Sequence, residues 1–396
     1  MTGADTAGFD LIDLEHLRGV GSLKWSKFPG TIGAFVAEMD FGTAPVVTSA
    51  LHAAVDAGLF GYLPAEVSAE MSLACAEWQR AAYGWEIDPA RVYPIADVVK
   101  GFEIALEHFS PPGAPVILPT PAYMPFLLVP PIHDREILQV PLVESGGRYA
   151  MDLDGLAAAF RAGGHLLVLC NPYNPVGRVF DRTELEGIAA VVADHDGRVF
   201  SDEIHSPVVY PGATHLPYAS VSDITASHTI TATSASKAWN LPGLKCAQLI
   251  LSNDADVAVW NRVGFLALHG ASTLGVVAAT AAYRSGKPWL NQVRGYLDGN
   301  RQLLTELIPA HLPGARYVPP EGTYIGWLDC RGLGIDGSPA EFFRDHAEVA
   351  LTDGRDCGAA GAGFVRLVFA TPRPILEQAV AQMGAAVRAA RTSALH

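Results

Sequence analysis

Short, unbroken runs of apolar residues alternate with amphipathic stretches between about residues 90 and 255. Runs of this kind, which lack polar alternation, are typical of strands that are buried on both faces of a sheet. We predict such strands at Pro115–Leu118, Glu136–Val140, Leu166–Cys170, Arg198–Ser201, Thr229–Ala232 and Ala247–Leu251. Between two of them, Asp181 and Glu184 form a capping-box start for a helix. The alternation predicts an α/β domain whose mainly parallel sheet is covered by helices.

The pattern changes after Pro288. We predict a long helix at Trp289–Leu307, short strands at Tyr324–Leu328 and Val365–Phe369, and a final helix at Ile375–Ala390. We therefore expect a large domain over residues 51–287 and a smaller α+β domain over residues 288–396. Residues 1–50 are expected to form an N-terminal segment that packs with the smaller domain.

Composition narrows the class of protein. Of 396 residues, 49% are apolar and 17% are charged, against a typical charged share of about 25%, so we expect a folded chain. The net charge of −14 argues against nucleic acid or an anionic membrane surface as a partner. The cysteines form no C-x-x-C pair, the histidines show no metal-ligand spacing, and residues 1–30 contain no apolar leader. We expect a cytoplasmic protein with free thiols and no metal, in which Phe265–Tyr283 is a packed interior or interface helix and not a membrane span.

Three polar motifs follow predicted strands, at the edge where open α/β sheets bind their ligands. Asn171–Gly177 (NPYNPVG) follows the third strand; it is either a rigid turn that holds amides outward or a plain connection. Ser201–His205 follows the fourth strand, and its Asp202 needs a cationic or N–H partner unless it simply caps a helix. Ser234–Lys237 (SASK) follows the fifth strand, with Lys245 close behind.

Lysine is scarce in this chain, so its two lysines near the fifth strand stand out. A lysine among small hydroxyl residues can lose solvation, which lowers its pKa and makes it a nucleophile; the alternative is an ordinary surface lysine. Ser234-x-x-Lys237 also matches the β-lactamase serine pattern, but the accompanying Lys-Thr-Gly and Ser-Asp-Asn are absent. Together the three motifs describe a pyridoxal phosphate (PLP) pocket. The lysine amine would react with the aldehyde, the carboxylate would pair with the pyridine nitrogen, the amide would bond the ring oxygen, and the hydroxyls would hold the phosphate.

A wider set of motifs extends this interpretation along nearly the whole chain. They are Phe35–Phe41 (FVAEMDF), Phe60–Tyr62, Pro121–Phe126, Asn171–Val179, Ser201–His205, Ser234–Lys245, Glu321–Arg331 and Phe364–Phe369. With these motifs in this order, the chain resembles the fold-type-I PLP enzymes of the aminotransferase class I/II superfamily. Within them it is most similar to the cystathionine β-lyase (C–S lyase) branch of the MalY/PatB type. The resemblance implies an aspartate-aminotransferase-like large domain and PLP as cofactor.

The resemblance also implies roles for residues around the cofactor ring. Lys237 would bond the cofactor and later act as the acid–base group. Asp202 would pair with the pyridine nitrogen, and Asn174 would bond the ring oxygen. Tyr123 would stack on the ring. His205 stands where common aminotransferases carry a tyrosine, which favours a lyase.

For the phosphate and the substrate, the resemblance implies a second set of residues. The phosphate would be held by Ser234, Ser236, Lys245, the helix start at Val98 and Val99, and Tyr62 from the other subunit of a homodimer. One departure is Asp97, which stands where the family usually has glycine and is unfavourable beside a phosphate. Either its side chain points away, or binding of the phosphate depends more on Lys245. Arg366 would clamp the substrate α-carboxylate, aided by the backbone near Ala37.

Three functions remain open from the sequence. The first is β-elimination on L-cystathionine or a related cysteine thioether, which gives a thiol, pyruvate and ammonia. The second is an aminotransferase that acts on an L-amino acid with the same residues. The third is a PLP-binding protein that regulates a partner protein, although intact Lys237, Asp202 and Arg366 argue for catalysis.

Overall fold

The computed structural model describes residues 7–393; residues 1–6 and 394–396 of the two predicted outer segments lie outside the described residues. Its main sheet has seven strands in the order β2-β10-β9-β8-β7-β3-β4. They are β2 (Val92–Ile95), β3 (Val116–Thr120), β4 (Ile137–Pro141), β7 (Leu166–Cys170), β8 (Arg198–Asp202), β9 (Thr229–Thr233) and β10 (Ala247–Leu251). The six predicted runs are confirmed as strands, and β3, β7, β9 and β10 are buried along their whole length.

Two features of this sheet were not predicted. The edge strand β2 shows no clear apolar run, because it is only four residues long and contains Tyr93 and Pro94. Strand β10 runs antiparallel to both β2 and β9, whereas the pairs from β9 to β4 are parallel. Between β9 and β10 the chain forms turns and the 3-10 helix η3 (Pro242–Leu244) instead of a crossover helix, so β10 returns in the opposite direction.

Helices connect and cover the strands of the main sheet. They are α4 (Pro45–Asp56), α5 (Ala65–Tyr83), α6 (Val98–His108), α7 (Pro125–Ile132), α8 (Leu153–Arg161), α9 (Arg182–Asp194), α10 (Asp223–His228), α11 (Asp254–Leu268) and α12 (Thr273–Ser285). The predicted capping box of α9 is confirmed, because the Asp181 side chain accepts from the Glu184 N–H and the Glu184 side chain accepts from the Asp181 N–H, both at 2.9 Å. A two-stranded hairpin, β5 (Val143–Ser145) and β6 (Arg148–Ala150), lies beside this layer.

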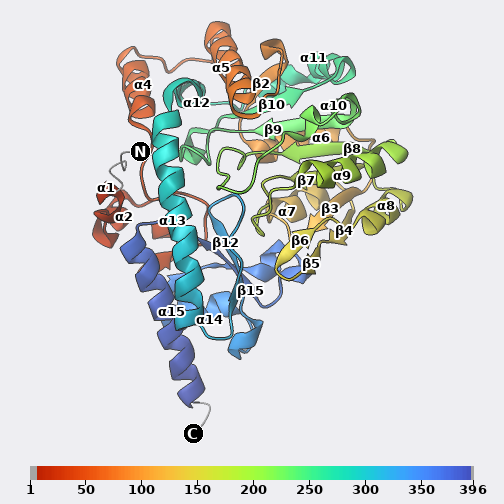
Figure 1. Ribbon diagram of the computed structural model, residues 1–396. Coiled ribbons are helices and arrows are strands. Elements are labelled where there is room, and N and C mark those ends of the chain that lie inside the picture. The colour runs from red at the N-terminus through yellow and green to blue at the C-terminus, as the bar shows by residue number, and fades with distance from the viewer. Residues whose placement is uncertain (1–6, 394–396) are drawn as a thin grey trace.

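A second, antiparallel sheet of order β11-β12-β15-β14 lies in the C-terminal part. Its strands are β11 (Arg316–Tyr317), β12 (Ile325–Asp329), β14 (Thr352–Asp353) and β15 (Phe364–Val368), and its helices are α13 (Lys287–His311), α14 (Pro339–Ala347) and α15 (Arg373–Ser393). The predicted long and final helices and both predicted strands are confirmed within a few residues. Figure 1 shows α13 as a long helix that runs from the neighbourhood of α12 and α4 to that of α15.

The N-terminal segment contacts this C-terminal part. It contains α1 (Ala7–Asp10), α2 (Leu14–Val20), α3 (Leu23–Ser26) and β1 (Ile32–Gly33), and β1 pairs in parallel with β13 (Val349–Ala350). The buried ammonium of Lys24 forms an ion pair with Asp40 at 2.7 Å, and Trp25 donates to the same carboxylate. The domain limits at residues 50 and 287 stay a prediction.

The single packed helix predicted over Phe265–Tyr283 is wrong. The chain bends by 116° between α11 and α12, and the Ser272 side chain caps the new helix by accepting the Gly275 N–H. Phe265 and Leu266 at the end of α11 are exposed, whereas α12 is largely buried. Among residues 7–393, no single helix is long and apolar enough to cross a membrane. The bent pair α11 and α12 has the required length and apolarity only when the two helices are taken together.

Candidate active site

The three polar motifs meet in one cavity at the carboxyl ends of β7, β8 and β9. These strands are neighbours and parallel, so their carboxyl ends lie at one edge of the sheet. The cavity measures about 660 Å³. Twelve of the residues predicted for the site line it: Ala37, Val98, Val99, Tyr123, Asn174, Asp202, His205, Ser234, Ser236, Lys237, Lys245 and Arg366.

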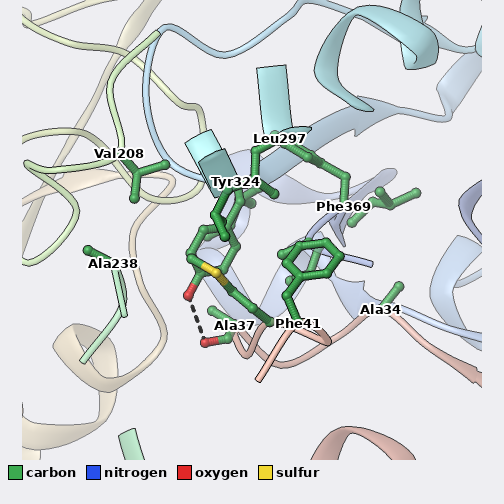
Figure 2. Packing of buried hydrophobic residues seen from close by; sticks show 14 of the residues in the cluster. Ala34, Ala37, Phe41, Val208, Ala238, Leu297, Tyr324 and Phe369 are labelled. Carbon is green, nitrogen blue, oxygen red and sulfur yellow. Dashed lines mark hydrogen bonds between the residues drawn. The ribbon is translucent and has the colours of Figure 1, made fainter. Parts of the chain in front are cut away.

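Lys237 lies in the turn after β9, and its ammonium group reaches the N-terminal segment. Its Nζ donates to the carbonyl oxygen of Ala37 at 3.0 Å, and the hydroxyl of Tyr324 donates to the same oxygen at 3.0 Å. Figure 2 shows this tyrosine in a cluster of buried apolar residues, with its hydroxyl directed at Ala37. Burial and, less strongly, the positive charge of Arg366 lower the pKa of Lys237 to about 8. A lysine of this kind is partly neutral near pH 7 and can act as a nucleophile or a base.

Asp202 ends β8 and is almost completely buried. Its Oδ1 accepts from the N–H of Ile204 at 3.1 Å, and the thiol of Cys170 lies 3.6 Å from its Oδ2. Among the residues that the structure describes, no cation forms an ion pair with it. The pKa of Asp202 is raised to about 6, because burial raises it more than these hydrogen bonds and the charge of Lys237 lower it. A buried carboxylate without an ion-pair partner is unfavourable, so a positively charged N–H group that binds in the cavity would stabilise its ionised form.

Two aromatic side chains line the cavity beside these groups. His205 is buried, and its Nδ1 has no hydrogen-bond partner among the residues that the structure describes. Burial, together with the charges of Lys237 and Arg366, lowers its pKa to about 3. The imidazole is therefore neutral at ordinary pH. Its ring meets that of Tyr324 edge to face, with 5.8 Å between centroids. Tyr123 packs edge to face on Phe126, which leaves a ring face available to the cavity.

Arg366 projects from the central strand β15 of the small sheet and is fully buried at one wall of the cavity. Its Nη1 donates to Asn174 Oδ1 at 3.2 Å, and its Nη2 donates to the carbonyl of Phe35 at 2.7 Å. Its Nε has no partner within the described chain. The guanidinium is thus fixed from two sides while N–H groups remain for a ligand, which is the geometry that suits a carboxylate.

Another part of the cavity lining is formed by the start of α6 and the turns around β9 and β10. Asp97 caps α6 by accepting from the Lys100 N–H at 2.8 Å, and it forms a 2.8 Å ion pair with Lys245. Burial raises the pKa of Asp97, but the hydrogen bonds from Lys245 and Lys100 outweigh it and leave the pKa lowered. The Ser234 hydroxyl donates to the Cys246 carbonyl at 2.7 Å and accepts from the Ser236 N–H at 3.0 Å.

Not every predicted residue is found here, and some residues of the cavity were missed. Tyr62 does not line this cavity; it is 94% exposed beside an apolar groove near the end of α11. Its predicted contact from a partner subunit stays a prediction. Sequence reasoning missed two charged residues that line the cavity, Lys27 and Arg344, which carry no motif signal. It also missed Tyr324, a buried residue of the Glu321–Arg331 motif that does not line the cavity but donates to the Ala37 carbonyl.

We expect the reactivity of Lys237 to follow its lowered pKa. In protein freed of cofactor, reductive methylation of Lys237 with formaldehyde requires the neutral amine. Its rate should therefore rise about tenfold per pH unit up to about pH 8 and then level off, instead of rising to about pH 10 as for an ordinary lysine. Peptide mass spectrometry over a pH series measures this rate. A rate that still climbs tenfold per unit between pH 9 and 10 would contradict the lowered pKa.

The fold and the site together define a PLP-dependent enzyme. Over residues 36–382 the chain matches the family Aminotransferase class I and II, and it belongs to that family, whose cofactor is pyridoxal 5′-phosphate. It is 37% identical over 370 residues to the cystathionine beta-lyase of Corynebacterium glutamicum, covering 92% of this chain and 96% of that protein. It is 32% identical over 393 residues to protein MalY of Escherichia coli, covering 97% and 100%.

A solved structure extends this likeness to three dimensions. A protein of Corynebacterium diphtheriae, assigned as a PLP-dependent beta-cystathionase, superposes with a TM-score of 0.91 at 42% identity, covering 96% of this chain and 99% of that one. The resemblance to fold-type-I PLP enzymes and to the cystathionine β-lyase branch is therefore confirmed, as is the predicted α/β fold class.

Proposed function

We propose that this protein is a PLP-dependent carbon–sulfur lyase that acts on L-cystathionine or a related L-cysteine thioether and releases a thiol, pyruvate and ammonia. The observation that carries the proposal is that Lys237, Asp202 and Arg366, from distant parts of the chain, face one cavity. The proposal is supported further by relatives of 37% and 42% identity that are named as lyases of cystathionine.

The residues of the cavity fit the cofactor. Asp202 is a buried carboxylate without a cationic partner in the described chain, and a protonated pyridine nitrogen would supply one. Asn174 and Tyr123 would contact the ring oxygen and the ring face. Ser234, Ser236, Lys245, the first turn of α6 at Val98 and Val99, and Tyr62 of a partner subunit would hold the phosphate. His205, which is neutral, would pack beside the ring.

PLP, when bound, supplies an electron sink for charge that develops at the substrate Cα. The chain's own residues then have three tasks. Lys237 removes the Cα proton, because its amine has a pKa of about 8 and is partly neutral at pH 7. Arg366 binds the α-carboxylate, and the Ala37 carbonyl positions the Lys237 amine. Asp202 keeps negative charge opposite the ring nitrogen, where positive charge stabilises the transition state.

A lyase and an aminotransferase are separated by what each needs as a second substrate. The purified PLP-loaded protein should release pyruvate from L-cystathionine with no keto acid present. An aminotransferase would instead need a keto acid as amino acceptor and would form a new amino acid. Product formation that depends strictly on the keto acid would reject the lyase proposal and establish the alternative.

We also propose that the protein is a homodimer. The groove beside Tyr62 is lined by apolar residues, and the neighbouring Phe60, Phe265 and Leu266 are 69%, 73% and 77% exposed. Large exposed apolar patches mark interaction sites. Leu266 and Lys245 line the same surface pocket, so a second copy of the chain on this face would lie next to the proposed phosphate site. We expect about twice the chain mass of 42.0 kDa in sedimentation equilibrium; a monomer mass would reject the dimer.

Two substitutions at the phosphate end should change cofactor affinity in opposite directions. Lys245→Ala removes a point charge that binds ground and transition states alike, so cofactor loss on dialysis should increase while kcat at saturating cofactor changes little. Asp97→Asn keeps a cap for α6 but releases Lys245 and removes an acid beside the phosphate, so it should raise affinity by about three- to fivefold, the scale of an exposed ion pair. If both variants bound the cofactor with the same affinity as the parent protein, the phosphate would have to bind elsewhere.

A further inference from the structure

The cavity does not end at Arg366; it continues to a charged mouth formed by α3 and α14. The mouth includes Lys27, just after α3, and Arg344 of α14. Both cations face one aromatic ring: Lys27 Nζ lies 5.3 Å and Arg344 Cζ 5.7 Å from the centroid of Phe28. Two chain segments more than 300 residues apart thus bring two positive charges within 6 Å of one ring centroid at the edge of the cavity, an arrangement that favours a bound anion.

These charges are available for a ligand. Lys27 forms no ion pair with any residue in the range 7–393; its contacts are the rings of Phe28 and Phe35 at 5.3 and 5.4 Å. Arg344 contacts the carboxylate of its neighbour Asp345 through Nε at 2.9 Å and Nη2 at 3.4 Å, and its Nη1 has no hydrogen bond to any of residues 7–393. The side chain of Arg344 is only 37% exposed, so part of its solvation is already lost.

The mouth is linked directly to the proposed substrate anchor. The carbonyl of Phe35 accepts from Arg366 Nη2 at 2.7 Å and from the Thr352 hydroxyl at 2.8 Å, while the ring of the same residue lies under Lys27. One fixed residue therefore spans the distance between the two cationic sites. A thioether whose α-carboxylate binds Arg366 would direct its leaving arm along Phe35 toward Lys27 and Arg344.

An acid lies beside these cations. Glu341 precedes Arg344 by three residues on α14, so the two side chains share one face of the helix, and both line the cavity. The carboxylate of Glu341 has no hydrogen bond or ion pair within the described part of the chain. The mouth thus offers both signs of charge, as the amino and carboxylate groups of an amino-acid end require.

We propose that Lys27 and Arg344 form a subsite for a carboxylate at the far end of the leaving arm, and that Glu341 takes an ammonium group beside it. This inference rests on the proposed lyase function and specifies its substrate class: thioethers whose departing half is itself charged, such as an amino-acid thiol. The residues proposed to hold the cofactor are separate from these three: they lie at or after the ends of β3, β7, β8 and β9, at the start of α6, just before β10, and at Tyr62 of a partner subunit.

The test compares three thioethers on the PLP-loaded enzyme: L-cystathionine, S-(2-carboxyethyl)-L-cysteine and S-ethyl-L-cysteine. Lys27→Gln and Arg344→Gln should each lower kcat/KM for the first two by about three- to tenfold, mainly through KM, and leave the third within twofold. Glu341→Gln should affect only L-cystathionine. Lys287→Gln, an exposed lysine outside the cavity, is the matched control and should affect none. A loss that is equal for all three thioethers, or absent for the carboxylates, overturns the subsite.

A binding measurement separates this inference from the proposed function. The α-methyl analogue of S-(2-carboxyethyl)-L-cysteine has no Cα proton, so it can bind but cannot undergo β-elimination. Its Kd for the PLP-loaded protein, measured by calorimetry, should rise by the same three- to tenfold in Lys27→Gln and Arg344→Gln. If no thioether yields pyruvate, the lyase proposal fails, but these Kd values still decide the subsite. Unchanged Kd values in both variants reject it even for an active lyase.

Discussion

Replacing Lys237 with alanine is expected to abolish thioether cleavage, lowering kcat by about 10⁴-fold or more, the upper range for loss of a positioned acid–base group. The covalent link between chain and cofactor should disappear as well. The fold should persist, because burial disfavours the charged form of this lysine, as its pKa of about 8 indicates, and its removal relieves that unfavourable term. Pyruvate release, mass spectrometry after borohydride reduction, and thermal unfolding measure the three effects.

The matched control for this variant is Lys245→Ala. It removes a second cavity lysine, yet it should keep the covalent link and most of kcat when cofactor is saturating. The assignment of Lys237 would be wrong if Lys237→Ala retained activity together with a reducible bond to the cofactor. A variant that lost activity only because it unfolded would be recognised by its lowered melting temperature.

Arg366→Lys should lower kcat/KM for a thioether substrate by about 2–3 kcal/mol, the scale of a hydrogen bond to a charged group. The charge is kept, but an ammonium cannot reproduce the parallel N–H donors, nor can it bond Asn174 and the Phe35 carbonyl in the same plane. Because the clamp also orients the Cα–H bond, kcat should fall along with affinity. Cofactor content should stay normal.

Steady-state kinetics of pyruvate release, together with the cofactor absorbance, test this expectation. A thioether that lacks the α-carboxylate serves as control and should respond little to the substitution. If Arg366→Lys stayed within twofold of the parent enzyme, the anchor would be another arginine of the cavity. Arg344 and Arg355 would be tested next, since both line it.

Much of the site could be predicted because its key residues carry local signals. Asn174 and Lys237 follow β7 and β9, and Asp202 ends β8; the sequence shows each strand as a run of four or five residues. Parallel neighbours place their carboxyl ends together, so these residues were expected to converge. Arg366 and Tyr123 had no such signal and were assigned only through the family resemblance. The cavity contains both, although their roles remain to be tested.

What the sequence determined by itself was the class of fold and the chemistry of the pocket. Apolar runs, capping residues and strand-end motifs depend on neighbours a few positions apart, and such patterns can be read along a chain. They indicated the buried strands, the helix that begins after Asp181, and a scarce lysine among serines opposite a buried carboxylate.

Only the tertiary structure decided which distant groups meet. Three features depend on how distant segments of the chain pack together. They are the hydrogen bond from Lys237 to the Ala37 carbonyl, the ion pair between Asp97 and Lys245, and the antiparallel direction of strand β10. The charged mouth arises in the same way, because Lys27 and Arg344 face one ring from opposite ends of the sequence. No local pattern encodes these contacts: burial and packing of whole elements bring the partners together, and the pKa values of Lys237 and Asp202 follow from that burial.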